Sequence, residues 1–526
     1  MQKLFPRWLA GVFFAAFLAL GLGTAADYGP PWDEADEMDI LRMNLWEYAR
    51  VLQWDESAFE ARAALADPLT LNPLVPISQS IEQDHGACAF YPMAGVVMDE
   101  TLSEEVRSAY WHMWCWAVFT LGAAALYGVC RQLGLSRPWA LLGPVLLLVS
   151  PRFFAQGHVN NKDIALFSLA LCVLWQALRV MRAPRMGTGL LFALFGAMAA
   201  NTKVAGLALW GLCGLFVLAE QIRQKNMTRS TWAVAGVTLA AFAGIYALLT
   251  PALWADAAGF LRYLAQNALA FQRWQNTVLF RGALFEVASH PLPWYYLPYM
   301  IVATTPLWVL ALIALGAVSA LTEHRERLPL LLTLCMAVLP LAFAVITRTH
   351  VYNGWRHFYF VYGPMLALAA FGACRVWRRV RTKRLWAAVL AVCVTMQGVG
   401  IVREHPYQYA YYQPLVRARG TDYNELDYWN ISVRDALVRL AEETQGEISV
   451  SGAELWSENG IRKALAAMPE AESRRFTLCE EGRYVVANAT YANFVPALTG
   501  VGERFVLYAY GQPIMRVYER VGEAEP

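Results

Sequence analysis

Two neighbouring carboxylates, Asp33 and Glu34, stand a few residues after the first apolar segment of the chain. The segment before them, residues 27–32, contains a glycine and two prolines, which predict an extended turn rather than an ordinary helix face. A carboxylate beside an apolar wall such as Trp32 has a raised pKa and can act as a general base, worth roughly 10²–10⁴-fold in rate. The alternative is a solvated acidic loop without a chemical role.

A second polar segment, residues 150–163, links two short apolar segments and ends at Asp163. Polar residues beside a bilayer are costly and usually mark a pathway or a site. An aspartate facing Asp33 could bind a divalent cation through oxygen ligands or orient a sugar hydroxyl. His158 is more typical of a hydrogen-bonded structural histidine than of a ligand. Lys203 stands between two further apolar segments, where a lysine either reaches the membrane surface or meets an anion.

A third segment, residues 348–359, interleaves basic and aromatic side chains. Arg356 suits bidentate phosphate recognition, and His357 offers a further donor. Aromatic residues such as Tyr352 and Trp355 could hold a sugar face or an isoprenoid chain. The alternative is an interfacial aromatic belt whose charges reach toward water.

The composition indicates that membrane-spanning helices must position these residues. Of 526 residues, 57% are hydrophobic and only 16% are charged, whereas soluble chains are about 25% charged. Apolar runs of roughly 17–25 residues therefore indicate a polytopic membrane protein. The net charge of +2 and the lack of a basic stripe with interleaved aromatics give no sign of nucleic-acid binding.

The positive-inside rule orients the chain when Lys3 and Arg7 are placed in the cytoplasm. About eleven spans then put nearly all basic loops inside and the carboxylates outside. We expect the first apolar run to be retained; the alternative is a signal peptide cleaved after residues 24–26. The expected spans are 9–26, 110–130, 139–149, 164–178, 190–200, 204–219, 232–254, 295–321, 328–346, 358–374 and 385–402.

We expect two domains. Residues 1–402 form the membrane domain, with residues 27–108 as its first outer loop, and residues 403–526 form a small α/β domain outside the membrane. Of nine scattered cysteines, Cys88 and Cys479 look extramembrane and are either paired or free. Strands are expected at 448–451, 476–478, 484–487, 505–510 and 514–518, and helices at 433–443 and 460–467.

These segments together resemble the GT-C superfamily of membrane glycosyltransferases. The resemblance is to bacterial relatives of the protein O-mannosyltransferases (glycosyltransferase family 39) and of the aminoarabinose transferases. It implies a polytopic α-helical GT-C-like fold in the cell inner membrane, with an active site facing the periplasm or exterior. The matching parts are Asp33-Glu34, residues 160–163, 201–207 and 353–358, and the aromatic junction 405–429.

The resemblance also implies an inverting transfer of a sugar from a polyprenyl-phosphate donor to a hydroxyl of a lipid, glycan or protein acceptor. Asp33 would deprotonate the acceptor, and Glu34 and Asp163 would orient the acceptor, the sugar or a cation. Superfamily members differ in their use of a metal, and Asp33 and Asp163 are the candidate ligands here. Lys203, Arg356 and His357 would neutralise the leaving phosphate. The remaining candidate substrate-binding residues are Asn160, Asn161, Lys162, Tyr352 and Trp355.

Two other functions compete with this one. A transporter or flippase for a lipid-linked or anionic solute would carry its ionisable residues near mid-span, often in repeated halves. The sequence instead places its charges at the ends of spans on one side and shows no repeat. A scaffold that binds envelope partners through its outer domain would leave Asp33 and Arg356 without a purpose.

Overall fold

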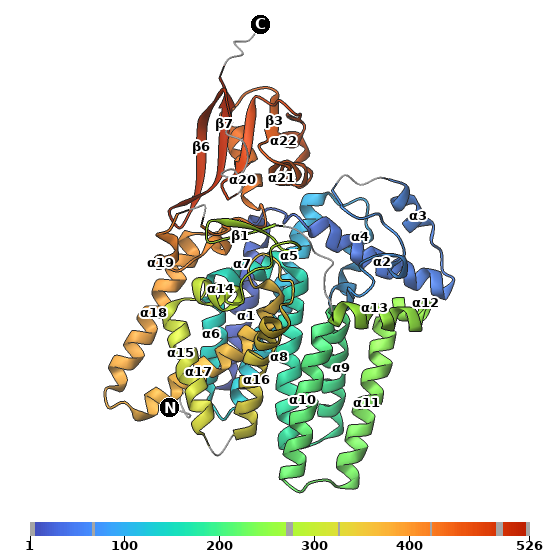
Figure 1. The fold of residues 1–526 in the computed structure, drawn as a ribbon, viewed down its shortest axis with the longest axis vertical. Helices are drawn as coiled ribbons and strands as arrows, with labels where there is room; N and C mark the ends of the chain where they lie inside the picture. Colours follow the sequence, from blue (N-terminus) through green and yellow to red (C-terminus); the bar gives the residue numbers. More distant parts are fainter. Residues whose placement is uncertain are drawn as a thin grey trace.

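A bundle of long helices carries a small sheet domain at one end (Figure 1). The computed structural model describes residues 6–65, 69–269, 277–323, 327–420, 423–490 and 498–521. The long helices of the bundle are α1 (Arg7–Thr24), α5 (Glu104–Gln132), α8 (Asn161–Arg182), α9 (Met186–Thr202), α10 (Val204–Arg223), α11 (Arg229–Leu249), α16 (Arg327–Thr347), α17 (Tyr362–Arg379) and α18 (Lys383–Arg403).

Two further helix pairs are sharply bent. α6 (Arg137–Leu148) and α7 (Pro151–Val159) meet at 72°, and α14 (Tyr296–Thr304) and α15 (Leu307–Thr322) meet at 119°. Pro151 and Pro306 stand at the two breaks, because a proline lacks the amide that would continue a helix. The span expected at 295–321 is therefore two helices.

The number of spans follows from these helices. Among the described residues, eight helices are long and apolar enough to cross a membrane, or ten if each bent pair is one span. α9 is a shorter apolar helix that packs beside α8, α10 and α11. The polytopic helical fold is as expected from the sequence, while length and composition alone do not establish a count of eleven.

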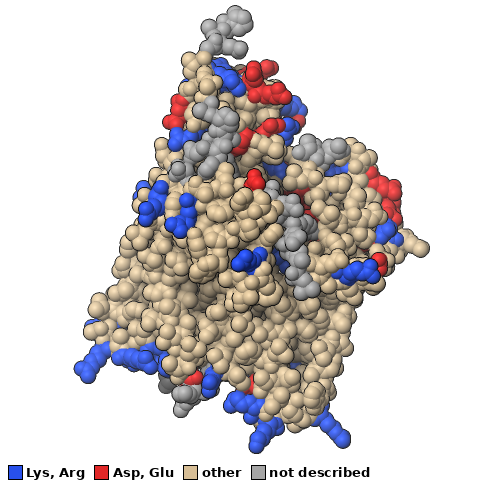
Figure 2. Space-filling model, in the orientation of Figure 1, with Lys and Arg blue, Asp and Glu red and all other residues tan. Residues whose placement is uncertain are grey.

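Basic residues gather at the end of the bundle away from the sheet domain (Figure 2). They close α5, α8, α10 and α17 and open α6, α11, α16 and α18. This asymmetry is the one that the positive-inside rule describes. The residues are Arg131, Arg182, Arg223, Arg379, Arg137, Arg229, Arg327 and Lys383.

The core of the bundle is aromatic where α1 meets α5. Phe17 stacks on Trp116 with ring centroids 5.1 Å apart, and Trp116 also packs edge-on against Phe119. A Cβ at Gly21 would lie about 2.0 Å from the Trp116 ring, so only glycine permits this approach. α1 is thereby fixed to the bundle, and its C-terminal end leads directly into the segment that carries Asp33.

The outer face of the bundle is covered by short elements from two loops and by the residues that follow α18. The first loop forms η2 (Ala25–Asp27), α2 (Glu34–Leu52), α3 (Ser57–Ala64), η3 (Ile77–Gln79), η4 (Cys88–Met93) and α4 (Ala94–Met98). The second forms α12 (Ala252–Ala255), α13 (Ala257–Leu269) and the hairpin of β1 (Thr277–Phe280) and β2 (Ala283–Glu286). Residues 404–431, which include the aromatic junction 405–429, contain η6 (Gln408–Ala410) and α19 (Pro414–Arg417), and η6 packs on α7.

The C-terminal sheet has the strand order β4-β3-β5-β7-β6. β3 is parallel to β4 and β5, whereas β7 is antiparallel to β5 and β6. Apolar side chains of α20 and the sheet, such as Leu437, Val450 and Val486, form its core. The elements are α20 (Ser432–Glu443), β3 (Ile448–Gly452), α21 (Leu455–Ala466), α22 (Glu470–Ser473), β4 (Phe476–Leu478), β5 (Tyr484–Asn488), β6 (Val501–Ala509) and β7 (Gln512–Arg520).

The two cysteines outside the bundle, Cys88 and Cys479, differ in their exposure to solvent. Cys88 begins η4 of the first loop and is buried, and its amide donates to Asn201 Oδ1. Cys479 is exposed and follows β4 of the sheet domain. Both are free thiols, which is the second of the two alternatives that the sequence left open.

Candidate active site

A cavity of about 400 Å³ lies at the end of the bundle that carries the sheet domain (Figure 1). We call it the polar cavity. Its walls come from α2, the start of α8, the break between α9 and α10, and η5 (Arg356–Val361). Of the candidate site residues, it brings together Asp33, Asn160, Asn161, Lys162, Asp163, Lys203, Tyr352, Arg356 and His357.

Asp33 lies immediately before α2, and its Oδ2 is 3.5 Å from Nη1 of Arg356. Burial raises the pKa of Asp33 to about 7, although the positive charges of Arg356 and other neighbours oppose the rise. A carboxyl that exchanges its proton near neutral pH has the property that a general base requires. The buried environment therefore supports the role expected of Asp33.

Arg356 begins η5, and its guanidinium is enclosed by aromatic rings. The ring centroids of Tyr352, Tyr428 and Trp429 lie 5.0, 5.1 and 5.0 Å from its central carbon. Its Nε is buried and has no hydrogen-bond partner among the described residues. An unpartnered buried donor is costly unless a ligand satisfies it, so this cation is suited to receive an anion. His357 lies beside it, with its ring 3.9 Å from that of Tyr352.

Asp163 and Lys203 form a buried ion pair, with Nζ 2.5 Å from Oδ1. Asn160 caps α8: its Oδ1 accepts from the Asp163 amide at 3.2 Å, and its Nδ2 donates to Asp163 Oδ2 at 3.0 Å. Both carboxylate oxygens of Asp163 are thus occupied by this chain. The arrangement fixes where the Lys203 ammonium points.

Glu37, His85 and Lys162 form a third polar group in the wall. Lys162 Nζ lies 2.7 Å from Glu37 Oε1 and 3.1 Å from His85 Nδ1. Asn161 donates to Glu37 Oε2 at 3.2 Å. Neither Glu37 nor His85 was predicted from the sequence as a site residue. The spacing of four residues between Asp33 and Glu37, which puts both on one helix face, is a signal that could have found the first; His85 offered none.

Two of the expected site residues do not line the cavity. Glu34 is 4% exposed and its Oε2 lies 2.7 Å from His112 Nε2, while His112 Nδ1 lies 3.1 Å from the Ala25 carbonyl oxygen. Successive residues at the start of a helix point about 100° apart, so Glu34 faces α5 when Asp33 faces the cavity. Trp355 is buried, and its indole donates to Thr304 Oγ1 at 2.9 Å. Neither belongs to the proposed site.

We expect replacement of Glu34 by alanine to lower the free energy of unfolding by about 1–3 kcal/mol, since it leaves the buried His112 ring without its hydrogen-bond partner. Thermal denaturation of the detergent-purified protein measures the loss. Glu34→Gln keeps a hydrogen-bonding partner for His112 and should recover part of the stability. An alanine variant as stable as wild type would show that the pair contributes nothing.

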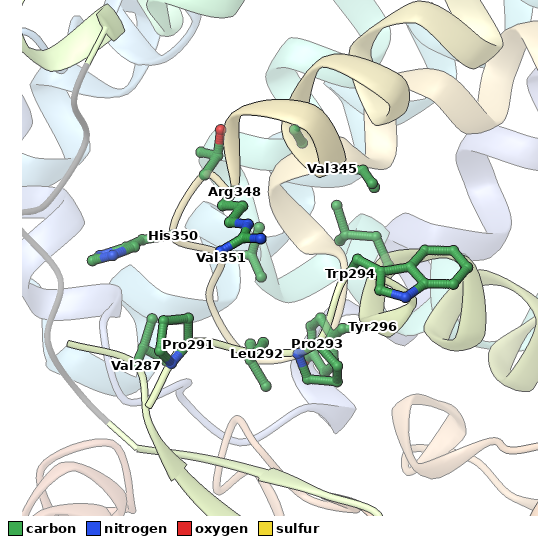
Figure 3. A pocket seen from close by; sticks show the side chains of 13 residues that line it. Val287, Pro291, Leu292, Pro293, Trp294, Tyr296, Val345, Arg348, His350 and Val351 are labelled. Carbon is green, nitrogen blue, oxygen red and sulfur yellow. The ribbon is translucent and has the colours of Figure 1, made fainter. Parts of the chain in front are cut away.

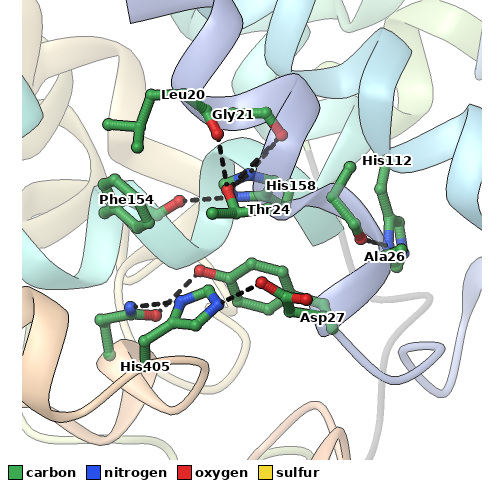
Figure 4. Close-up of polar contacts among 12 residues, drawn as sticks. Leu20, Gly21, Thr24, Ala26, Asp27, His112, Phe154, His158 and His405 are labelled. Atoms are coloured by element: carbon green, nitrogen blue, oxygen red, sulfur yellow. Dashed lines mark hydrogen bonds and ion pairs between the residues drawn. The ribbon is translucent and has the colours of Figure 1, made fainter.

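His158 lies outside the cavity, in a histidine-rich contact between α1 and α7 (Figure 4). Its ring stacks on Trp116 and Tyr28 with centroids 4.3 and 4.5 Å away. Its Nε2 lies 3.1 Å from Thr24 Oγ1, and its Nδ1 lies 3.0 Å from the Phe154 carbonyl oxygen. All of these contacts are structural, in line with the expectation from sequence.

A second cavity, of about 360 Å³, lies between residues 287–297 and the end of α16 (Figure 3). We call it the apolar cavity, because most of its lining is proline, leucine, valine and tryptophan. Arg348 is the charged side chain among its lining residues. Thr349 and His350 line both this cavity and the polar cavity. An apolar space therefore adjoins, across a single loop, the polar cavity that contains Lys162, Lys203 and Arg356.

Asp33 and Asp163 do not form a site suited to a divalent cation. Among the residues that the structure describes, no three His, Cys, Asp or Glu side chains come together in a way that could hold a metal ion. Asp163 is neutralised by Lys203, and Asp33 faces Arg356. The two carboxylates expected as ligands are thus each already paired with a basic side chain of the chain itself.

No protein-family model and no curated protein sequence matches the chain. Among solved structures, it is similar to ArnT from Cupriavidus metallidurans, in the apo state and bound to undecaprenyl phosphate. The identities are 14% and 15%, the alignments cover 96% and 97% of this chain and 97% and 98% of the other, and both TM-scores are 0.48. It is also similar to an oligosaccharyltransferase of Archaeoglobus fulgidus in complex with Zn and sulfate, with 14% identity, a TM-score of 0.44, and 77% of this chain and 59% of the other covered.

At such identities and TM-scores, the likeness carries no inference about the activity of this chain. The function is therefore argued from the residues of the two cavities.

Proposed function

We propose that the protein transfers a sugar from a polyprenyl-phosphate donor to a hydroxyl group of an acceptor, with inversion at the anomeric carbon. The observation that carries the proposal is the pairing, in one cavity, of a carboxyl with a pKa near 7 and a buried arginine with an unpartnered donor. A base and an anion site within reach of each other are what a transfer with a phosphate leaving group requires.

In the proposed reaction, Asp33 takes the proton of the acceptor hydroxyl. The acceptor oxygen attacks the anomeric carbon from the face opposite the phosphate and forms the new glycosidic bond. The bond between the anomeric carbon and the phosphate oxygen breaks, and its electron pair leaves with the polyprenyl phosphate. Because a phosphate leaves as an anion, no acid catalyst is needed.

The cations of the cavity stabilise that leaving group. Arg356 offers two parallel donors in a planar fork, and Lys203 adds a point charge. Asp163 holds the ammonium of Lys203 in place, and His357 adds a donor beside Arg356. Preorganised charges of this kind supply a large share of the rate enhancement in transfer reactions.

The other residues of the wall would bind the sugar and the acceptor. Asn161 and Lys162 present amide and ammonium donors at the start of α8, next to Asn160, and Tyr352 presents an aromatic face. Side chains of these types bind sugar hydroxyls and sugar faces. This part of the wall would therefore set which sugar is accepted.

The apolar cavity supports a lipid-borne donor. It adjoins the polar cavity through Thr349 and His350, so an isoprenoid chain could lie in one space while its phosphate reaches Arg356 in the other. The exposed indole of Trp294 (71% exposed) flanks this cavity; tryptophans of this kind are enriched at membrane–water boundaries.

The distribution of basic residues along the bundle supports the proposed orientation of the protein in the membrane. The basic end of the bundle would lie in the cytoplasm, so the polar cavity would open on the outer face of the inner membrane. The cavity's ionisable residues lie at helix ends on this one face, which does not match the mid-span, repeated arrangement of a transporter.

The test compares envelope lipids and glycans, by mass spectrometry, from cells with and without the protein. In cells without the protein, we expect one class of glycan or lipid to be lighter by the mass of a single sugar. The polyprenyl-phosphate sugar should accumulate in the same cells. The purified protein should restore the mass when given that lipid fraction. Identical envelopes, together with no turnover of any polyprenyl-phosphate sugar supplied, would refute the proposal.

A further inference from the structure

We propose that the C-terminal sheet domain is a positioning device for the candidate base, in which Lys463 and Arg434 hold the segment that carries Asp33. This inference rests on the proposed function for its effect on transfer, although the contacts that carry it do not depend on that function. The segment concerned is residues 26–36, which runs from the end of α1 to the first turn of α2.

Arg434, on α20, binds the start of this segment. Its Nη1 donates to the carbonyl oxygens of Ala26 at 2.9 Å and Tyr28 at 3.0 Å, and its Nη2 donates to that of Asp27 at 2.5 Å. Carbonyls at the end of a helix have no partner within the helix. A guanidinium with several donors in a fixed plane is well suited to bind three of them at once.

Lys463, on α21, binds the end of the segment. Its ammonium donates to the carbonyl oxygen of Trp32, the residue before Asp33, and lies 3.7 Å from Asp36 Oδ2. Lys463 is only 8% exposed, and a lysine is buried in this way only when it is paired. The Trp32 amide donates to the Trp429 carbonyl oxygen at 3.2 Å. Both backbone polar groups of the residue next to Asp33 are therefore held by the C-terminal part of the chain.

The contact is close along its whole length. The Trp32 ring packs against Trp456 of α21 with centroids 5.0 Å apart. A Cβ at Gly29 would lie 2.4 Å from the Ile431 carbonyl oxygen, so the two segments could not approach in this way with a larger residue. The segment has little freedom to shift while the sheet domain is docked.

The same part of the chain also orients the partner of Asp33. Tyr428 and Trp429, at the end of the junction, face the Arg356 guanidinium. Asp33 and Arg356 are thus each held by residues that follow the last span. Because a displacement of about 1 Å in a reacting group can cost 10²-fold in rate, docking of this domain would govern whether the two groups meet at a productive distance.

Lys463 also contributes to the charge around Asp33. The charged groups that face this carboxyl are Arg356 on η5, Glu37 on α2, Lys463 on α21 and Lys162 on α8. Of these, the three cations lower the pKa of Asp33 and Glu37 raises it. Removal of the Lys463 charge would therefore raise the pKa further, which a purely structural contact would not do.

The test uses the full-length protein with Lys463→Met and, as matched control, Arg462→Met. Arg462 neighbours Lys463 on α21, but its side chain is 43% exposed and pairs only with Glu458 among the contacts described. For Lys463→Met we expect kcat to fall about tenfold, with the acid limb of the pH–rate profile moved to higher pH. The fall in kcat relative to wild type should be larger at low pH than at high pH. Lys463→Arg should restore the limb, and Arg462→Met should match wild type.

A second measurement does not require transfer activity. Hydrogen–deuterium exchange of the peptide covering residues 26–37 should be faster in Lys463→Met and Arg434→Met than in wild type and Arg462→Met. Unchanged exchange, or an unmoved acid limb in an active variant, would overturn the positioning role. If the two variants exchanged faster than wild type but the wild-type protein itself transferred no sugar, the positioning contacts would stand and the proposed function would be refuted.

Discussion

Replacement of Asp33 by asparagine is expected to slow sugar transfer by roughly 10²–10⁴-fold, the contribution of a general base. Asparagine has the shape of aspartate but cannot accept the acceptor's proton. It can still face Arg356, so the protein should fold and insert normally. Initial rates of purified protein with a polyprenyl-phosphate sugar measure the effect, and Asp55→Asn, an exposed carboxylate of the same outer loop, is the matched control.

The pH dependence of the transfer rate provides a second test of Asp33 as the base. Because burial raises the pKa of Asp33 to about 7, the wild-type rate should fall as the pH drops through that value and the base becomes protonated. The residual rate of Asp33→Asn should lack this limb. Turnover by the variant at the wild-type rate would remove Asp33 as the base.

Replacement of Arg356 by alanine is expected to weaken donor binding by about 2–4 kcal/mol, roughly 30- to 1,000-fold, since it removes a buried charge that faces the leaving phosphate. The KM for the donor should rise far more than the KM for the acceptor. Arg356→Lys keeps the charge but loses the planar fork and the stacking on the surrounding rings, so it should recover only part of the affinity.

Binding of the polyprenyl phosphate alone, measured by titration, separates this effect from catalysis. Arg281→Ala removes an exposed arginine on the same outer face, where it donates to Tyr423, and should bind the lipid as wild type does. If Arg356→Ala raised the KM for the acceptor and left that for the donor unchanged, the phosphate role would be wrong.

Much of the cavity could be predicted from the sequence because topology constrains it. Asp33, Asp163, Lys203 and Arg356 each stand at an end of an apolar run, and the charge alternation puts those four ends on one side. The strands of the sheet domain were predicted from a different signal, the alternation of apolar and polar residues at positions such as 484–487.

Other features depend on rotation and packing that a sequence pattern does not specify. Whether Asp33 or Glu34 faces the cavity depends on the angle at which α2 begins, and the packing of His112 against the end of α1 decides it. The break at Pro306 was not predicted, although a proline inside an apolar run is a signal for one, and its angle of 119° has no signal in the sequence. The binding of residues 26–36 by Arg434 and Lys463 joins segments too distant for any local signal.

That last contact bears on how the protein matures. Tyr28 and Arg434, which hydrogen-bond to each other, are 406 positions apart in the chain. During synthesis, Arg434 and Lys463, which hold the segment carrying Asp33, are made after all the helices of the bundle. The segment that carries Asp33 would therefore lack these contacts until the last domain had been made and had docked.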